Sequence, residues 1–181
     1  MTIRLIGLYT RSRRVDWCLA VIAVTAGLRW MVRTQGTGPD AFAILLRLVP
    51  LIAAGVVVTA GLAGPFGLVE RSASTWLPWL RCGQVLATTL VASGAFALSG
   101  TSMRDLAGFI GLTLLTGAAL GPARCWTVPL GYALACAGEA YLDEQPWWAW
   151  PLRAAGDTGA LAMGMALLVA GVVAASATGT R

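Results

Sequence analysis

Residues Thr158–Thr180, with the sequence TGALAMGMALLVAGVVAASATGT, contain no charged side chain. The hydrocarbon core of a bilayer is about 30 Å thick, and a helix needs roughly 20 apolar residues to cross it. This stretch meets that length. The stretches Leu48–Val69 and Cys82–Met103 are also uncharged and similarly long. The sequence therefore predicts an all-α, polytopic membrane protein.

The composition of the whole chain agrees with these stretches. Of its 181 residues, 57% are hydrophobic and only 12% are charged, and the mean hydropathy is +0.74. This length leaves room for a single transmembrane domain over residues 1–181 and for little outside it. All 13 basic residues are arginine, and Ala, Gly, Val and Leu are abundant. We read this as the product of a GC-rich bacterial genome, and we expect a multi-pass protein of the bacterial inner (plasma) membrane.

Short breaks that hold Pro, Gly or Arg divide the chain into six expected transmembrane helices. Gly121-Pro122-Ala123-Arg124 separates the fourth from the fifth. A re-entrant hairpin over residues 106–120 and 126–141 is the alternative for those two segments. The expected spans are 15–31, 41–61, 77–98, 106–120, 126–141 and 153–174.

The arginines also predict the orientation of the chain. Basic residues accumulate on the cytoplasmic side of membrane proteins. A cytoplasmic N-terminus places eight arginines inside and about four outside, so we expect both termini in the cytoplasm. The same rule accounts for the net charge of +5, and no nucleic-acid partner is expected. The inner set is Arg4, Arg11, Arg13, Arg14, Arg71, Arg81, Arg124 and Arg181, and the outer set is Arg33, Arg104, Arg153 and, near the interface, Arg29.

Two segments outside the spans have amphipathic character. Residues 1–14 mix apolar side chains with arginines at roughly helical spacing, which is typical of a segment lying on the anionic inner leaflet. A disordered basic tail is the alternative. The outer loop, residues 142–152, holds three tryptophans whose rings favour the membrane–water boundary. A ligand-stacking site is the alternative for these three, Trp147, Trp148 and Trp150.

Ionisable residues inside the expected spans are candidates for function, because burying charge in lipid is costly. Arg47, Glu139 and Asp157 all fall toward the outer half. They are expected either to line the outer mouth of a translocation path or to form ion pairs, such as Arg47 with Glu139 or Asp157. Arg29 either joins them or extends its long side chain toward the interface.

Small residues recur in the spans, and they allow helix backbones to approach closely. In the sixth span Ala160, Gly164 and Gly171 predict a packing face. The sequence leaves open whether that face meets another span or another chain.

Several kinds of chemistry are not expected. The chain has no histidine, its four cysteines form no C-x-x-C pair, and it has no P-loop pattern G-x-x-x-x-G-K-[ST]. Paired carboxylates of the D-x-x-D kind are also missing from the sequence. We therefore predict no catalytic residue, no metal site and no cofactor, and we expect a protein that is not itself an enzyme.

The connection between the second and third spans, residues 63–81, has the most specific pattern. It contains Glu70-Arg71, a small polar stretch, and then Leu77-Pro78-x-x-Arg81 before an apolar helix. This order resembles the cytoplasmic loop of ABC-2-type permeases, the membrane subunits of ATP-binding-cassette exporters. The stretches 121–126 and 147–152 are similar to those of small actinobacterial ABC exporter membrane proteins. Typical permeases of the family are longer than this chain.

The resemblance implies six spans and a cytoplasmic coupling element formed by Glu70, Arg71, Leu77, Pro78 and Arg81. It implies a separate cytoplasmic ATPase subunit and a second permease subunit, either identical or different, besides membrane lipids. The implied function is export of an amphiphilic or apolar compound. The alternatives are the substrate-capturing component of an energy-coupling importer, and a non-transporting membrane accessory or immunity protein.

Overall fold

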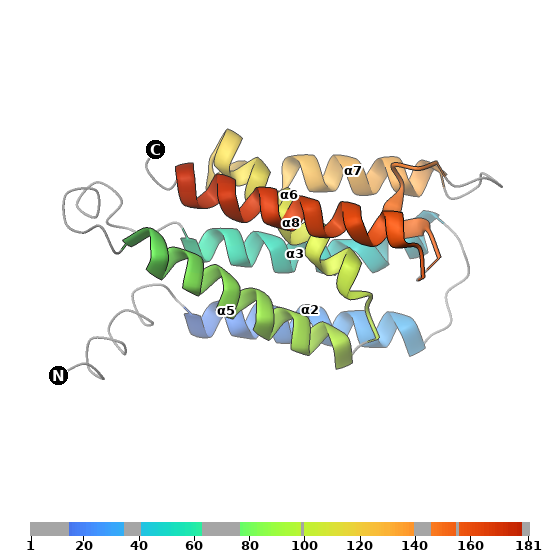
Figure 1. The fold of residues 1–181 in the computed structure, drawn as a ribbon. Helices are drawn as coiled ribbons and strands as arrows, with labels where there is room; N and C mark the ends of the chain where they lie inside the picture. Colours follow the sequence, from blue (N-terminus) through green and yellow to red (C-terminus); the bar gives the residue numbers. More distant parts are fainter. Residues whose placement is uncertain are drawn as a thin grey trace.

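The computed structural model describes residues 15–34, 41–62, 77–98, 100–139, 146–154 and 156–178. All regular structure within these ranges is helical, which confirms the all-α prediction (Figure 1). The α-helices are α2 (Val15–Thr34), α3 (Ala41–Leu62), α5 (Leu77–Leu98), α6 (Met103–Leu120), α7 (Thr127–Gly138) and α8 (Thr158–Thr178), and the short 3-10 helices are η1 (Pro122–Arg124) and η3 (Trp150–Leu152).

Successive α-helices alternate in direction, so the described chain forms an up-and-down bundle with two distinct ends (Figure 1). At the first end, α2, α5 and α7 begin while α3, α6 and α8 finish. We call this the α2-start end. At the other, α3, α6 and α8 begin while α2, α5 and α7 finish, and we call this the α6-start end.

Two helix starts differ from the expected span boundaries. The fourth helix begins at Met103, so Arg104 and Asp105 belong to its first turn and not to the preceding loop. The sixth begins at Thr158, because the Pro-containing turn of η3 occupies residues 150–152 and Asp157 caps the helix start. The break at residues 121–124 does separate two helices, as the Gly-Pro pair predicts.

Three helices are long and apolar enough to cross a membrane: Ala41–Gly61 in α3, Met103–Leu120 in α6 and Thr158–Ala177 in α8. Shorter apolar stretches lie in α2 and α5, at Trp17–Met31 and Val85–Leu98. Helix α7 has 12 residues, which at 1.5 Å per residue gives roughly 18 Å. It is shorter than the hydrocarbon core, so α7 alone does not reach from one face to the other.

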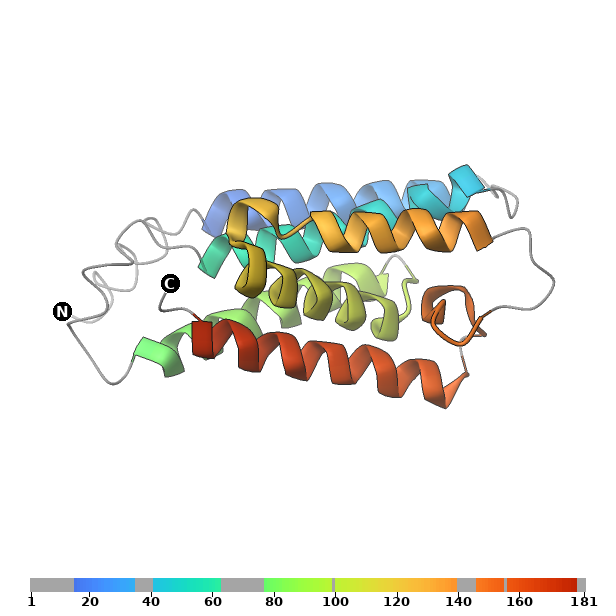
Figure 2. The ribbon, with the colours of Figure 1, turned by 90° about the horizontal axis from the view of Figure 1, so that it is seen from above.

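Helix α6 is the centre of the bundle, with α3 and α7 on one side and α8 on the other (Figure 2). Its span is 56% buried, whereas that of α8 is 17% buried. Glycines bring α6 and α8 together: a Cβ at Gly111 would overlap the backbone of Leu167, and one at Gly164 would lie 2.7 Å from the carbonyl oxygen of Arg104. The small-residue face of α8 therefore packs within its own chain.

The contact between α6 and α3 uses glycine and threonine in reciprocal positions. Gly55 of α3 faces Thr113 of α6, and Gly117 of α6 faces Thr59 of α3, with a Cβ at Gly117 falling 2.6 Å from Thr59 Cγ2. Both threonine hydroxyls donate hydrogen bonds to carbonyl oxygens of their own helices. These pairs let the two backbones approach without leaving a polar group unsatisfied.

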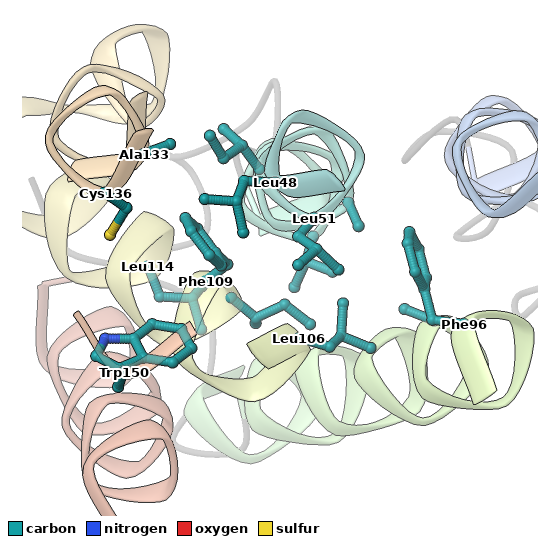
Figure 3. Packing of buried hydrophobic residues seen from close by; sticks show 14 of the residues in the cluster. Leu48, Leu51, Phe96, Leu106, Phe109, Leu114, Ala133, Cys136 and Trp150 are labelled. Carbon is teal, nitrogen blue, oxygen red and sulfur yellow. The ribbon is translucent and has the colours of Figure 1, made fainter. Parts of the chain in front are cut away.

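Large apolar side chains fill the space around α6 (Figure 3). The buried set labelled there comes from α3, α5, α6, α7 and η3, and comprises Leu48, Leu51, Phe96, Leu106, Phe109, Leu114, Ala133, Cys136 and Trp150. The outward faces are also apolar, with Leu161, Met165 and Val169 exposed at intervals of one turn along α8. An apolar core surrounded by an apolar exterior is the pattern of a bundle whose solvent is lipid.

Candidate functional site at the α6-start end

A buried polar contact centres on Arg104, in the first turn of α6. Its side chain is only 4% exposed. Nε donates to Asp105 Oδ1 at 3.0 Å, while the two terminal nitrogens donate to the carbonyl oxygens of Ala154 at 2.8 Å and Arg153 at 3.1 Å. The planar guanidinium therefore joins the start of α6 to the chain that leads into α8.

Asp105 accepts the hydrogen bond that orients this arginine. It stands in the first turn of α6, near the positive end of the helix dipole. A second arginine, Arg29 at the far end of α2, acts electrostatically on Asp105, and its Nε donates to Thr101 Oγ1 at 3.3 Å. The cluster thus connects α2, the α5–α6 turn, α6 and the approach to α8.

An aromatic group lies beside this charged cluster. Trp150 is 1% exposed, and its ring stacks on Tyr132 with centroids 5.8 Å apart and an interplanar angle of 17°. Phe109 contacts both rings, at 5.4 Å from Trp150 and 6.0 Å from Tyr132. The Tyr132 hydroxyl donates to the carbonyl oxygen of Trp148. Gly108 makes room for the indole, because a Cβ there would overlap the Trp150 ring.

Asp157 caps the N-terminus of α8. Its Oδ1 accepts the backbone N–H of Ala160 at 3.0 Å, and its Oδ2 accepts Arg153 NH1 at 2.8 Å. The Ala160 N–H and then the Arg153 side chain lower the pKa of the Asp157 carboxyl below its usual value. Asp157 thus forms an ion pair with Arg153, four residues before it in the chain.

The other two predicted path residues lie on α3 and at the end of α7. The Arg47 side chain is exposed on α3, and Glu139 is the C-terminal cap of α7, partly buried. The three tryptophans do not share one surface. Trp147 is 74% exposed and Trp148 is partly buried, whereas Trp150 lies inside the protein. The expectation of a common place at the membrane boundary is therefore corrected for Trp150.

The predicted coupling element falls mostly outside the described residues. Glu70 and Arg71 lie outside them, as do the amphipathic segment 1–14 and residues 142–145 of the outer loop. Leu77, Pro78 and Arg81 form the beginning of α5. Pro78 stands in the first turn, where a missing backbone N–H costs the helix no hydrogen bond.

Sequence reasoning did not select Arg104 and Asp105 as site residues. The available signal was an adjacent pair of opposite charges, Met103-Arg104-Asp105-Leu106, at the boundary of an apolar run. Assigning the run a start at residue 106 left both charges in a loop. Their burial depends on η3 and the approach to α8, which come together with α6 only in the folded bundle.

Chemically, the site holds chain segments together. Its charged donors bind backbone carbonyls and a neighbouring carboxylate, and among the described residues no group of three His, Cys, Asp or Glu side chains is placed to hold a metal ion. In comparisons with known proteins, no protein-family model, no curated protein and no solved structure matches this chain.

Proposed function

We propose that this chain is the membrane-spanning permease subunit of an ATP-binding-cassette transporter that exports an amphiphilic or apolar compound. The observation that supports this best is the up-and-down order of the helices (Figure 1). Helices α2 and α5 begin, and helices α3 and α8 finish, at the α2-start end of the bundle. In this proposal the connection between α3 and α5 and both ends of the chain lie in the cytoplasm, as the arginine distribution favours.

In this proposal six helices cross the membrane. The Glu70–Arg81 element docks on a separate ATPase subunit. Because α5 begins at Leu77, movement of that element is transmitted directly to a helix of the bundle. The second half of the transporter is another permease subunit, identical or different. Arg47 and Glu139 remain candidates for the outer mouth of the path, whereas Asp157 caps the N-terminus of α8.

One observation favours a second candidate, a non-transporting membrane accessory protein. The space between α3, α6 and α8 is filled by side chains such as Leu51, Phe109 and Leu114 (Figure 3). A permease subunit of this kind would carry its path at the interface with its partner subunit. The capture-component alternative loses support, because the ring of Trp150 is taken up by packing and cannot stack on a ligand while it stays there.

The test is purification of the tagged full chain in mild detergent, followed by mass spectrometry and measurement of ATP hydrolysis. We expect a stoichiometric ATP-binding-cassette ATPase with the unmodified chain. Glu70→Arg and Arg81→Glu should each reduce its recovery at least about tenfold, because like charges facing each other across an interface are strongly unfavourable.

Arg124→Glu is the matched control. Arg124 is exposed at the same end of the bundle but lies in η1, away from the coupling element. Its reversal should leave recovery of the ATPase unchanged. Recovery of the chain alone, or with only lipid or a bound small molecule, would reject the permease assignment and favour the accessory protein.

A further inference from the structure

Residues 146–154, which we call the strap, close the α6-start end between α6, α7 and α8 (Figure 2). Their only regular structure is the single turn η3. Three contacts from other elements hold this short segment: Arg104 binds its last two carbonyls, Tyr132 binds the carbonyl of Trp148, and the Trp150 ring is inserted against α6.

Two of these contacts are hydrogen bonds to backbone carbonyls of the strap. Arg104 is 4% exposed in this arrangement, so release of the strap must let water reach its guanidinium group. These hydrogen bonds differ from the contacts between α6 and α8, where glycines place backbone against backbone over several turns. The hydrogen bonds to the strap thus come from side chains, whereas α6 and α8 meet backbone to backbone.

In the third contact, the Trp150 indole of the strap fills a recess. Gly108 forms its floor, and Phe109 and Tyr132 form its walls. Cys136 lies one turn beyond Tyr132 on α7 and is fully buried, with its sulfur directed to the side on which Trp150 packs (Figure 3). Withdrawal of Trp150 would open this recess and bring Cys136 to its surface.

We propose that the strap is a movable cover at the α6-start end, that Trp150 is its plug, and that Arg104, held by Asp105, is its latch. In the closed state the latch holds the carbonyls of Arg153 and Ala154, and the indole seals the recess. In the open state these bonds are broken, and the recess lined by Gly108, Tyr132 and Cys136 faces outward. This inference does not depend on an ATPase partner.

Cys136 provides a native reporter for opening. In the full chain, alanine replaces Cys18, Cys82 and Cys125, so that Cys136 is the remaining cysteine. The protein is reconstituted in lipid vesicles without ATP. The rate at which a small methanethiosulfonate reagent modifies Cys136 is then measured. Arg104→Gln, which removes the guanidinium fork, should raise this rate at least about tenfold. Tyr132→Phe, which removes one hydrogen bond and keeps the ring, should raise it by a smaller factor.

Gly108→Ala supplies a second route that leaves the latch untouched. The added Cβ overlaps the Trp150 ring, so the plug is displaced and Cys136 should again react faster. This variant keeps the proposal testable if Arg104→Gln fails to assemble.

The matched control is the chain that retains Cys125 alone. Cys125 is buried near the start of α7, at the opposite end of the bundle, where Gly117 packs beside it. Its modification rate should not change with any of the three substitutions. An unchanged Cys136 rate in Arg104→Gln and in Gly108→Ala would overturn the proposal, as would an equal rise at Cys125, because that result indicates general loosening of the fold.

Discussion

Gly111 of α6 lies directly against the backbone of Leu167 in α8, with no space between them for a methyl group. On the same line, a Cβ at Gly171 would lie 2.5 Å from the carbonyl oxygen of Gly111. The central helix of the bundle is thus held to α8, whose apolar span is only 17% buried, by backbone-to-backbone packing, and this contact sets the distance between them.

Gly111→Ala should lower the free energy of unfolding by about 1–3 kcal/mol, because neither backbone can move aside without disturbing the rest of the core. Thermal unfolding of the detergent-solubilised protein measures the effect. Gly94→Ala, in an α5 position with nothing within 4 Å, should be neutral or slightly stabilising. Equal stability of the two variants would show that α6 and α8 are not packed as described.

The contact between Gly117 of α6 and Thr59 of α3 can be tested with a destabilising substitution and a second substitution that relieves it. Gly117→Ala should destabilise the protein, since its Cβ would meet the Thr59 methyl group. Thr59→Ser removes that methyl group and keeps the hydroxyl that donates to the carbonyl oxygen of Gly55 at 2.9 Å. The double variant should therefore recover most of the stability lost in the single one. Strictly additive losses in this cycle would contradict the contact.

Asp157 predicts how stability at the start of α8 depends on pH. Its pKa is lower in the folded protein than in the unfolded chain, so its contribution is present above the unfolded pKa of about 3.9 and is lost as pH falls through the folded value. Asp157→Asn can still cap the helix but carries no charge. Below about pH 4 the thermal unfolding temperature of the unmodified chain should fall more steeply with pH than that of the Asp157→Asn variant.

The helical fold was predictable because apolar length and charged or Gly-Pro breaks are local properties. The predicted 77–98 segment matches α5, and the 41–61 segment ends one residue short of α3. The site was less accessible to sequence reasoning. Arg104 and Trp150 are buried by segments distant along the chain, and the local sequence does not contain those segments.

The structure was also needed to identify the helix that packs against the small-residue face of α8. Glycines at helical spacing indicate close approach by some helix, and the spacing is the same whether that helix belongs to the same chain or to another. Gly164 and Gly171 meet α6 of their own chain. A second permease subunit, if it binds, must therefore use another surface.

In the proposed six-span arrangement the two ends of the bundle lie on opposite sides of a membrane, and α7 is the shortest of the described α-helices. Arg124 precedes α7 and Trp147 follows it, and both side chains are exposed. Cysteine is introduced at one position at a time, as Arg124→Cys or Trp147→Cys, in a chain whose four native cysteines are replaced by alanine. Intact spheroplasts are then treated with a membrane-impermeant maleimide. We expect labelling of the Trp147→Cys chain in intact cells and of the Arg124→Cys chain only after permeabilisation. Labelling of both chains from the same side would show that α7 re-enters without crossing, and would contradict the six-span arrangement.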